Sequence, residues 1–140
     1  ALDDYIEVAR TRQVGPRKMK DDPFARTLAA EVRASIDEMK LTMVRNFDAM
    51  MEHCRAGETI PVEDRVRYRY DSAVVADRCV DLCGKMLKAS GSTGIRHGSP
   101  LLARHLDILA SQAHVANNVN PFANNLGGML FGDENADFAV

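Results

Sequence analysis

The most regular pattern of apolar and polar positions lies between residues 22 and 56. Apolar residues recur there at steps of three and four, which is the spacing of one face of an α-helix. These positions are Leu28, Val32, Ile36, Met39, Met43, Phe47, Met50 and Cys54. Asp21 or Asp22 can cap the start of the helix, and Gly57 can end it. The pattern predicts a helix over residues 23–56 whose methionines fill a core, with an adaptable binding surface as the alternative.

Four further segments have helical character. They are residues 1–13, 62–89, 100–117 and a short stretch around 121–128. The second of these carries one apolar face, formed by Val66, Tyr70, Ala73, Val80, Cys83 and Leu87. A Gly-Pro pair after the first segment and a Ser-Pro pair before the third supply stop and start signals. The basic stretch between the first two helices is expected to be irregular.

The helices dominate the pattern, because no stretch has the strict alternation of a β-strand. Long helices with short connections predict an all-α fold, an up-and-down antiparallel helical bundle. We expect residues 1–132 to form one helical bundle domain and residues 133–140 a loose C-terminal tail. The chain starts without methionine and within a helical pattern, so we expect it to be a piece of a larger protein.

The composition of the chain limits the classes of partner that it can have. The chain has 140 residues, 46% of them hydrophobic, and a net charge of −2. This balance argues against nucleic acid and membrane partners, and no apolar run is long enough to span a bilayer. With no secretory segment at its start, the chain is expected in the cytoplasm. Its three cysteines are interpreted as thiols without a catalytic role, and no Cys/His spacing indicates a metal site.

The segment 100–117 carries two lines of residues. An apolar line consists of Leu102, Leu106, Leu109, Ala113 and Ala116. A polar line of short side chains consists of Asp107, Ser111, His114 and Asn118. The polar line is either a solvent face or the wall of a cleft, where His114 could act as acid, base or hydrogen-bond donor with its tautomer set by a neighbour such as Asp107.

The stretch "GSTGIRHGSPL", residues 91–101, joins the two long helical patterns. It lacks the lysine and the spacing of a P-loop, and no strand precedes it. Taken alone, it is either a helix connector or a loop whose backbone can approach a ligand.

Several segments together resemble a known family. They are "DDPFARTLAAEVRASIDEMKL", "RVRYRYDSAVVADRCVDLCGKMLKASGSTGIRHGSPLLARHLDILASQAHVANN" and the terminal "GGMLFG". They are similar to the C-terminal helical domain of the acyl-CoA dehydrogenase fold, in the branch of two-component flavin-dependent monooxygenases that hydroxylate phenols. The most specific part is the glycine loop followed by Ser99, Asp107 and His114.

The resemblance implies a defined chemistry. A partner reductase supplies reduced FMN or FAD, and oxygen forms a C4a-hydroperoxyflavin that hydroxylates a small aromatic substrate. His114 and Asp107 would be catalytic. Arg10 or Arg12 would meet the flavin, as would Gly91, Ser92, Thr93 and Gly94. Asn117 and Asn118 are assigned to the substrate. The family also implies a homotetramer, a dimer of dimers, in which neighbouring subunits share the flavin.

This sequence departs from the family pattern after "SPL". Two positions that usually carry arginine are Ala103 and Leu106, while Arg104 lies beside them on another face. An acyl-CoA dehydrogenase proper, with FAD and a glutamate base, is the rival enzyme. Residues 117–125 contain no carboxylate, which counts against it. A helical oligomerisation module without activity is the non-enzymatic alternative.

Overall fold

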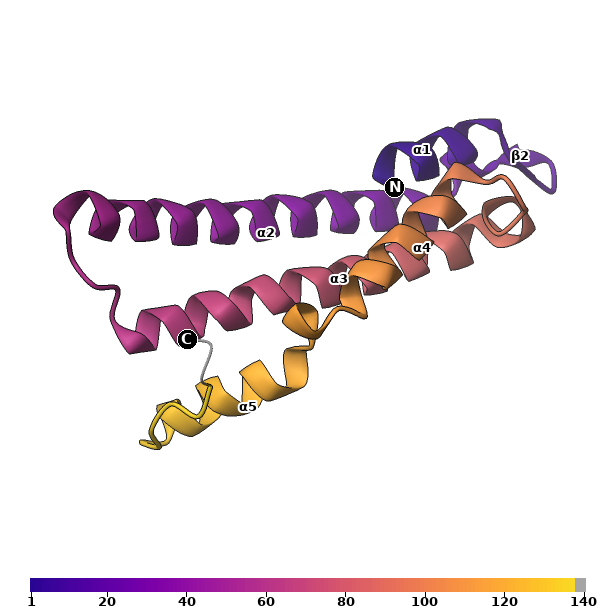
Figure 1. The fold of residues 1–140 in the computed structure, drawn as a ribbon. Helices are drawn as coiled ribbons and strands as arrows, with labels where there is room; N and C mark the ends of the chain where they lie inside the picture. The colour runs from indigo at the N-terminus through magenta and orange to yellow at the C-terminus, as the bar shows by residue number, and fades with distance from the viewer. Residues whose placement is uncertain (138–140) are drawn as a thin grey trace. The chain divides into compact units, whose positions relative to one another are not determined.

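The computed structural model describes residues 1–137 and confirms the all-α class. The α-helices of this part are α1 (Leu2–Thr11), α2 (Pro23–Ala56), α3 (Val62–Gly94), α4 (Pro100–Gln112) and α5 (Val119–Leu130) (Figure 1). Short elements join them: strands β1 (Gln13–Val14) and β2 (Arg17–Lys18), and the 3₁₀ turns η1 (Met19–Asp21) and η2 (Val115–Asn117). The chain reverses between α2 and α3, as an up-and-down bundle requires.

The chain divides into two compact units, which are described one at a time. Unit 1 consists of residues 1–37 and 78–111, and unit 2 of residues 38–77 and 112–140. The long helices α2 and α3 each contribute one half to either unit.

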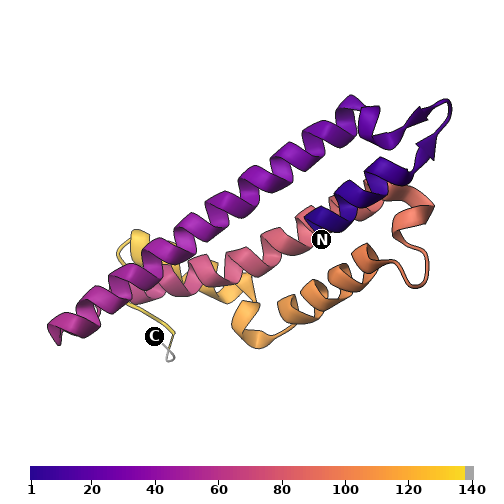
Figure 2. The ribbon, with the colours of Figure 1, turned by 90° about the horizontal axis from the view of Figure 1, so that it is seen from above.

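Unit 1 has a core to which all of its helices contribute. Its buried members are Tyr5, Ala9, Met19, Ala25, Val32, Cys83, Met86, Leu87 and Leu101. In Figures 1 and 2, α1 lies beside the start of α2 and the end of α3. The Tyr5 hydroxyl donates to the Ala25 carbonyl across 3.3 Å, which satisfies a polar group inside this core. Burial, together with the nearby charge of Asp22, raises the pKa of Tyr5.

The segment after α1 is more ordered than the sequence suggested. The helix ends at Thr11, and a two-residue antiparallel ladder pairs Gln13 with Lys18 and Val14 with Arg17. The Gly-Pro pair, expected only to stop the helix, forms the turn of this small hairpin. The prediction of an irregular stretch is therefore wrong for these residues.

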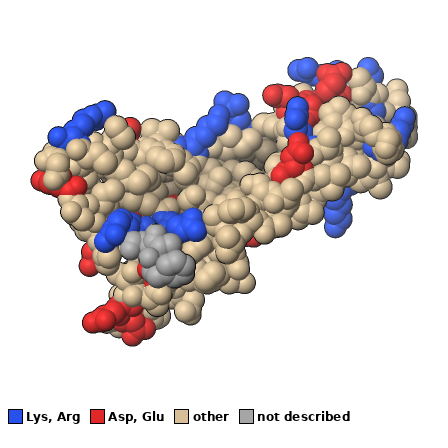
Figure 3. All heavy atoms as spheres, viewed as in Figure 1, with Lys and Arg blue, Asp and Glu red and all other residues tan. Residues whose placement is uncertain are grey.

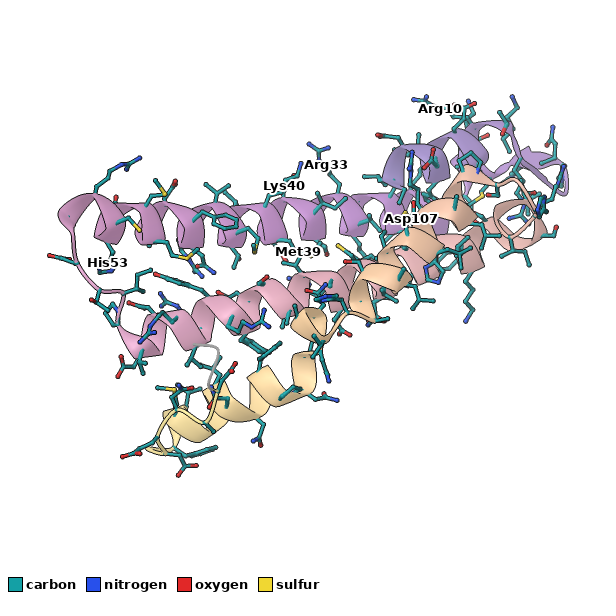
Figure 4. The ribbon with its side chains drawn as sticks, viewed as in Figure 1. Arg10, Arg33, Met39, Lys40, His53 and Asp107 are labelled. Carbon is teal, nitrogen blue, oxygen red and sulfur yellow. The ribbon has the colours of Figure 1, made fainter. Side chains whose placement is uncertain are left out.

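The start of α2 is capped by Asp22, whose Oδ1 accepts from the Phe24 amide across 2.9 Å. Its predicted apolar face is buried or partly buried through Met43 and again at Met50, and the prediction is wrong for Phe47 and Cys54. Phe47 is 54% exposed and Cys54 is exposed, whereas Asn46 is only 2% exposed. The buried line continues at seven-residue spacing from Met39 to Asn46, so Phe47 is rotated away from it. Figure 4 shows Met39 on one side of α2, with Arg33 and Lys40 pointing away from it.

The first half of α3 supplies the core of unit 2. Val66 and Ala73 are buried as the pattern predicted, and Tyr68 joins them. From α5, Phe122 is buried beneath the guanidinium of Arg69, whose Cζ lies 4.0 Å from the ring centroid. The helix continues beyond the predicted end at residue 89, to Gly94, through a kink at Gly91.

The helix α4 is shorter than predicted, and its buried face differs. It starts at Pro100, after Ser99, whose Oγ accepts from the Leu102 amide across a long 3.4 Å. Leu101 is fully buried, while Leu106 and Leu109 of the predicted apolar line are 54% and 43% exposed. Two adjacent leucines at 101 and 102 left the rotation of this helix undetermined by the sequence, and packing selects Leu101.

The tail described up to residue 137 is tied to α5. The Asn125 side chain donates to Asn135 Oδ1 and accepts from the Ala136 amide, both across 2.8 Å. This part is therefore held more firmly than the loose segment expected from its composition. Residues 138–140 of the expected tail lie outside the described residues.

The charged side chains are distributed over the surface without one dominant sign. On the face drawn in Figure 3, basic and acidic side chains form small separate groups, in keeping with the net charge of −2. Among the helices of the described residues, none is long and apolar enough to cross a bilayer.

Candidate functional site

In unit 1, Arg12 reaches from the end of α1 to the kink of α3. Its Nη1 donates to the carbonyl of Ala89 across 3.0 Å. Gly91 has φ of 55° and ψ of −147°, a conformation that side chains disfavour. A Cβ atom at Gly91 would lie 2.7 Å from the Arg12 Nη2 atom, so the end of the Arg12 side chain would have to shift. The missing side chain of Gly91 thus leaves the space that the guanidinium occupies.

Arg10 lies differently. Its side chain is exposed, with an Nη1 to Glu7 Oε2 distance of 3.8 Å along the same helix. Figure 4 shows it pointing outward from α1. The two arginines that the sequence left open are therefore distinguished: Arg12 contacts the glycine segment, and Arg10 takes part in a loose surface pair.

The remaining residues of the glycine segment differ in exposure. Ser92 is exposed and Thr93 is partly exposed, so both hydroxyls can be reached from solvent. Gly94 is buried, and a Cβ atom there would lie 2.5 Å from the Cβ of Ser90. Ser90 in turn donates to the Met86 carbonyl across 2.8 Å. The absence of a side chain at Gly94 is thus required by packing against Ser90.

Asp107 lies on α4 in unit 1, with an exposed side chain (Figure 4). Arg104, the only Lys or Arg on this helix, has its Nε 3.9 Å from Asp4 Oδ2 of α1. This separation makes a weak surface pair that joins α4 to α1.

His114, in unit 2, does not lie on a helix face as the sequence suggested. The helix α4 ends at Gln112, and His114 is the N-terminal capping residue of η2. Its Nδ1 accepts from the Ala116 amide across 3.1 Å. The polar line drawn from Asp107 to Asn118 along one helix is therefore wrong. Because Nδ1 is an acceptor, the neutral ring carries its proton on Nε2, and this atom remains available as a donor.

Asn117 and Asn118 line a polar pocket of unit 2 with a volume of about 520 Å³. Other lining residues come from α3 and from the end of α4, where Gln112 Nε2 donates to Asp77 Oδ1 across 2.8 Å. Amides and a carboxylate suit a ligand that carries hydroxyl groups.

A buried polar cluster of unit 2 escaped the sequence interpretation. Asn46 Nδ2 donates to Asp71 Oδ2 across 2.8 Å, and Arg45 Nη2 lies 3.2 Å from the same oxygen. Arg45 also donates to Asn46 Oδ1, across 2.9 Å from Nη2. The signal was an asparagine seven residues after Met39 in an otherwise apolar line.

Metal and thiol chemistry find no support in residues 1–137. No group of three or more His, Cys, Asp or Glu side chains there is arranged to hold a metal ion. Cys83 is buried, Cys79 partly buried and Cys54 exposed, all as thiols. Burial raises the pKa of both Cys79 and Cys83, which lowers their thiolate fraction at neutral pH.

Comparison with known proteins shows the family of this chain. The family model described as acyl-CoA dehydrogenase, C-terminal domain, matches residues 1–119. The oxygenase subunit HsaA of a flavin-dependent monooxygenase from Rhodococcus jostii (strain RHA1) is 34% identical over 101 residues, which are 72% of this chain and 26% of that protein. The chain thus spans about a quarter of the length of this relative.

Solved structures show the same likeness. The HsaA monooxygenase from M. tuberculosis has a TM-score of 0.86 and 27% identity, covering 99% of this chain and 35% of its own. The 3-HSA hydroxylase from Rhodococcus sp. RHA1 has a TM-score of 0.88 and 30% identity, covering 99% of this chain and 37% of its own.

Proposed function

Since the chain belongs to the family of acyl-CoA dehydrogenase C-terminal domains, we propose that residues 1–132 are the C-terminal helical bundle of a larger flavin-dependent monooxygenase. The enzyme takes reduced FMN or FAD from a partner reductase and hydroxylates a small aromatic substrate with oxygen. The observation that carries this proposal is the identity of 34% with a monooxygenase oxygenase subunit.

The residues of unit 1 fit a flavin phosphate in part. Arg12 supplies a cation beside Gly91, and Ser92 and Thr93 supply accessible hydroxyl donors. Gly94 fits less well, because the space beside its α-carbon is filled by Ser90. Arg12 is favoured over Arg10, which points outward. The bound flavin supplies the activation of oxygen, and these residues hold and orient it.

The residues of unit 2 suit the substrate. The Nε2 atom of His114 can donate a hydrogen bond to a phenol oxygen. After a change of tautomer, the same atom can accept the proton of the phenol. Asn117 and Asn118 line a polar pocket whose amides can bind further hydroxyl or carbonyl groups. Asp107, which lies in unit 1 and is exposed on α4, is proposed separately as a catalytic residue.

The same proposal includes assembly as a dimer of dimers in the cytoplasm. Large apolar side chains are exposed on the unit 2 half of α2, namely Leu41, Val44 and Met51. Apolar residues in such a row are typical of subunit interfaces. The three free thiols suit a reducing compartment.

Product analysis with the whole protein tests this function. The oxygenase, a flavin reductase, NADH, FMN or FAD and a set of phenols are incubated with ¹⁸O₂, and products are examined by mass spectrometry. Incorporation of one labelled oxygen atom is expected. Oxidation of an acyl-CoA thioester without oxygen incorporation would instead identify an acyl-CoA dehydrogenase. If neither phenols nor acyl-CoA thioesters were turned over, an oligomerisation module would be the remaining function.

The variant Arg12→Gln tests whether Arg12 contacts the flavin or contributes only to the surface charge. It should weaken the binding of reduced flavin by about 10-fold, the scale of one charge-assisted hydrogen bond. Arg10→Gln removes the same charge two residues earlier and serves as the control. Equal affinities of the two variants would overturn the assignment of Arg12.

A further inference from the structure

A second pocket of unit 2, with a volume of about 420 Å³, lies between the end of α2 and the start of α3. Its apolar walls are formed mainly by Met43, Phe47, Met50 and Tyr68. This volume is within the range of pockets that bind small molecules. None of these residues has a role in the flavin or substrate sites proposed above.

The charged groups that line this pocket are all cationic, beside the neutral polar side chains of Asn46 and Ser72. Arg65 and Arg69 line it, and no Asp or Glu is among its described lining residues. The nearby carboxylate of Asp71 already accepts hydrogen bonds from Asn46 and Arg45, so its charge is compensated there. The pocket therefore has an uncompensated positive charge within apolar walls, which favours an anion.

The two guanidinium groups differ in their surroundings. The Nε of Arg65 is buried, with no hydrogen-bond partner among residues 1–137. Because this atom is closed off from solvent, a ligand in the pocket would reach Arg65 through its terminal Nη atoms. Arg69 is fixed by stacking on Phe122 at 4.0 Å, which leaves the N–H groups in its own plane available.

From these observations we infer that the pocket binds a small carboxylate with an apolar body, such as an aromatic or branched aliphatic acid. The carboxylate accepts from Arg65 and Arg69, and the body contacts the methionines and the two aromatic rings. A monoanion matches this site better than a phosphate ester, since the walls are largely apolar.

Titration of the whole protein with sodium benzoate tests the inference. With the methionine methyl groups labelled with ¹³C, saturable NMR shifts in the millimolar range are expected at Met43 and Met50, and none at Met19, which is buried in unit 1. Benzamide, an uncharged analogue of the same shape, should bind at least about 10-fold more weakly. Absence of saturable shifts, or equal binding of benzamide, would overturn the proposal. Absence of shifts would instead favour a pocket that another subunit covers.

Variants of α3 supply the control. Arg65→Gln and Arg69→Gln should each weaken benzoate binding by about 10-fold or more. Arg67→Gln removes the same charge from the same helix, but Arg67 is paired with Asp64 across 2.8 Å and does not line the pocket. Affinity unchanged in both Arg65→Gln and Arg69→Gln would sink the inference. Circular dichroism of each variant identifies any that does not fold, and the other one then decides.

Discussion

The side-chain amide of Asn46 donates to the carboxylate of Asp71 across 2.8 Å, joining α2 to α3 at a buried position of unit 2. Asn46→Asp replaces this donor with a second carboxylate, so it should lower the free energy of unfolding at pH 7 by about 1–3 kcal/mol. Repulsion between two adjacent carboxylates favours the protonation of one of them as the pH falls, so at about pH 5 the loss should shrink. Urea unfolding at both pH values measures it, with Asn120→Asp at an exposed position as control. Equal losses at the two sites would show that the pair is unimportant.

The kink at Gly91 provides a second prediction. Gly91→Ala meets both a positive φ and the Arg12 guanidinium, whereas Gly98→Ala meets a positive φ of 81° in open space. The second variant should lose about 1 kcal/mol of stability, and the first about 0.5–1.5 kcal/mol more, because the displaced Arg12 side chain loses its hydrogen bond to Ala89. Arg12→Ala should cost less stability in the Gly91→Ala background than in the wild-type chain, as thermal unfolding of Arg12→Ala, Gly91→Ala, Gly98→Ala and the double variant can show. A purely additive double variant would contradict the contact.

Two glycines inside helices should respond in opposite directions to alanine. At Gly94 a new Cβ atom would lie 2.5 Å from Ser90, so Gly94→Ala should destabilise by about 1–3 kcal/mol. At Gly127 of α5 nothing lies within 4 Å, and the higher helix propensity of alanine should stabilise by about 0.5–1 kcal/mol. Chemical unfolding curves give both values. Stabilisation at Gly94 would mean that the end of α3 adopts another conformation.

These contacts show what the sequence could and could not predict. Periodicity and capping residues located α2 and its first residue, because both depend on neighbours within one helical turn. The rotation of the second half of α2 was mispredicted because Asn46 is buried through Asp71, 25 positions later. The choice between Arg10 and Arg12 likewise depends on Ala89, 77 positions later.

The candidate site was harder to predict than the fold. The resemblance pointed to His114, but the helix that was to carry it ends two residues earlier, at Gln112. A capping role for His114 has no periodic signal, since it depends on backbone angles at one residue. The carboxylate pocket was also missed: Phe47 and Met50 had been assigned to a core, whereas they line an open surface of unit 2.

The capping role of His114 can be separated from its proposed chemistry. Asn is a good N-capping residue, so His114→Asn should keep the hydrogen bond from Ala116 and change stability by less than about 0.5 kcal/mol. It lacks a titratable ring, so kcat for hydroxylation should fall by about 10²–10⁴-fold. His114→Ala should lose both properties. If His114→Asn kept full activity, the histidine would serve only as a cap.

The cysteines should differ in reactivity because the thiolate is the reactive form. Burial raises the pKa of Cys83, so the folded chain holds this thiol neutral, and iodoacetamide should modify it far more slowly than the exposed Cys54. A pKa that is higher in the folded than in the unfolded state stabilises the fold below the unfolded value, about 8.5, and this contribution disappears as pH rises through the folded pKa. Unfolding curves should therefore show stability falling above about pH 8.5, and less so in Cys83→Ala. Peptide mass spectrometry measures the labelling, and in urea the three thiols should react alike. Labelling of Cys83 as fast as Cys54 without urea would show that the core of unit 1 opens readily.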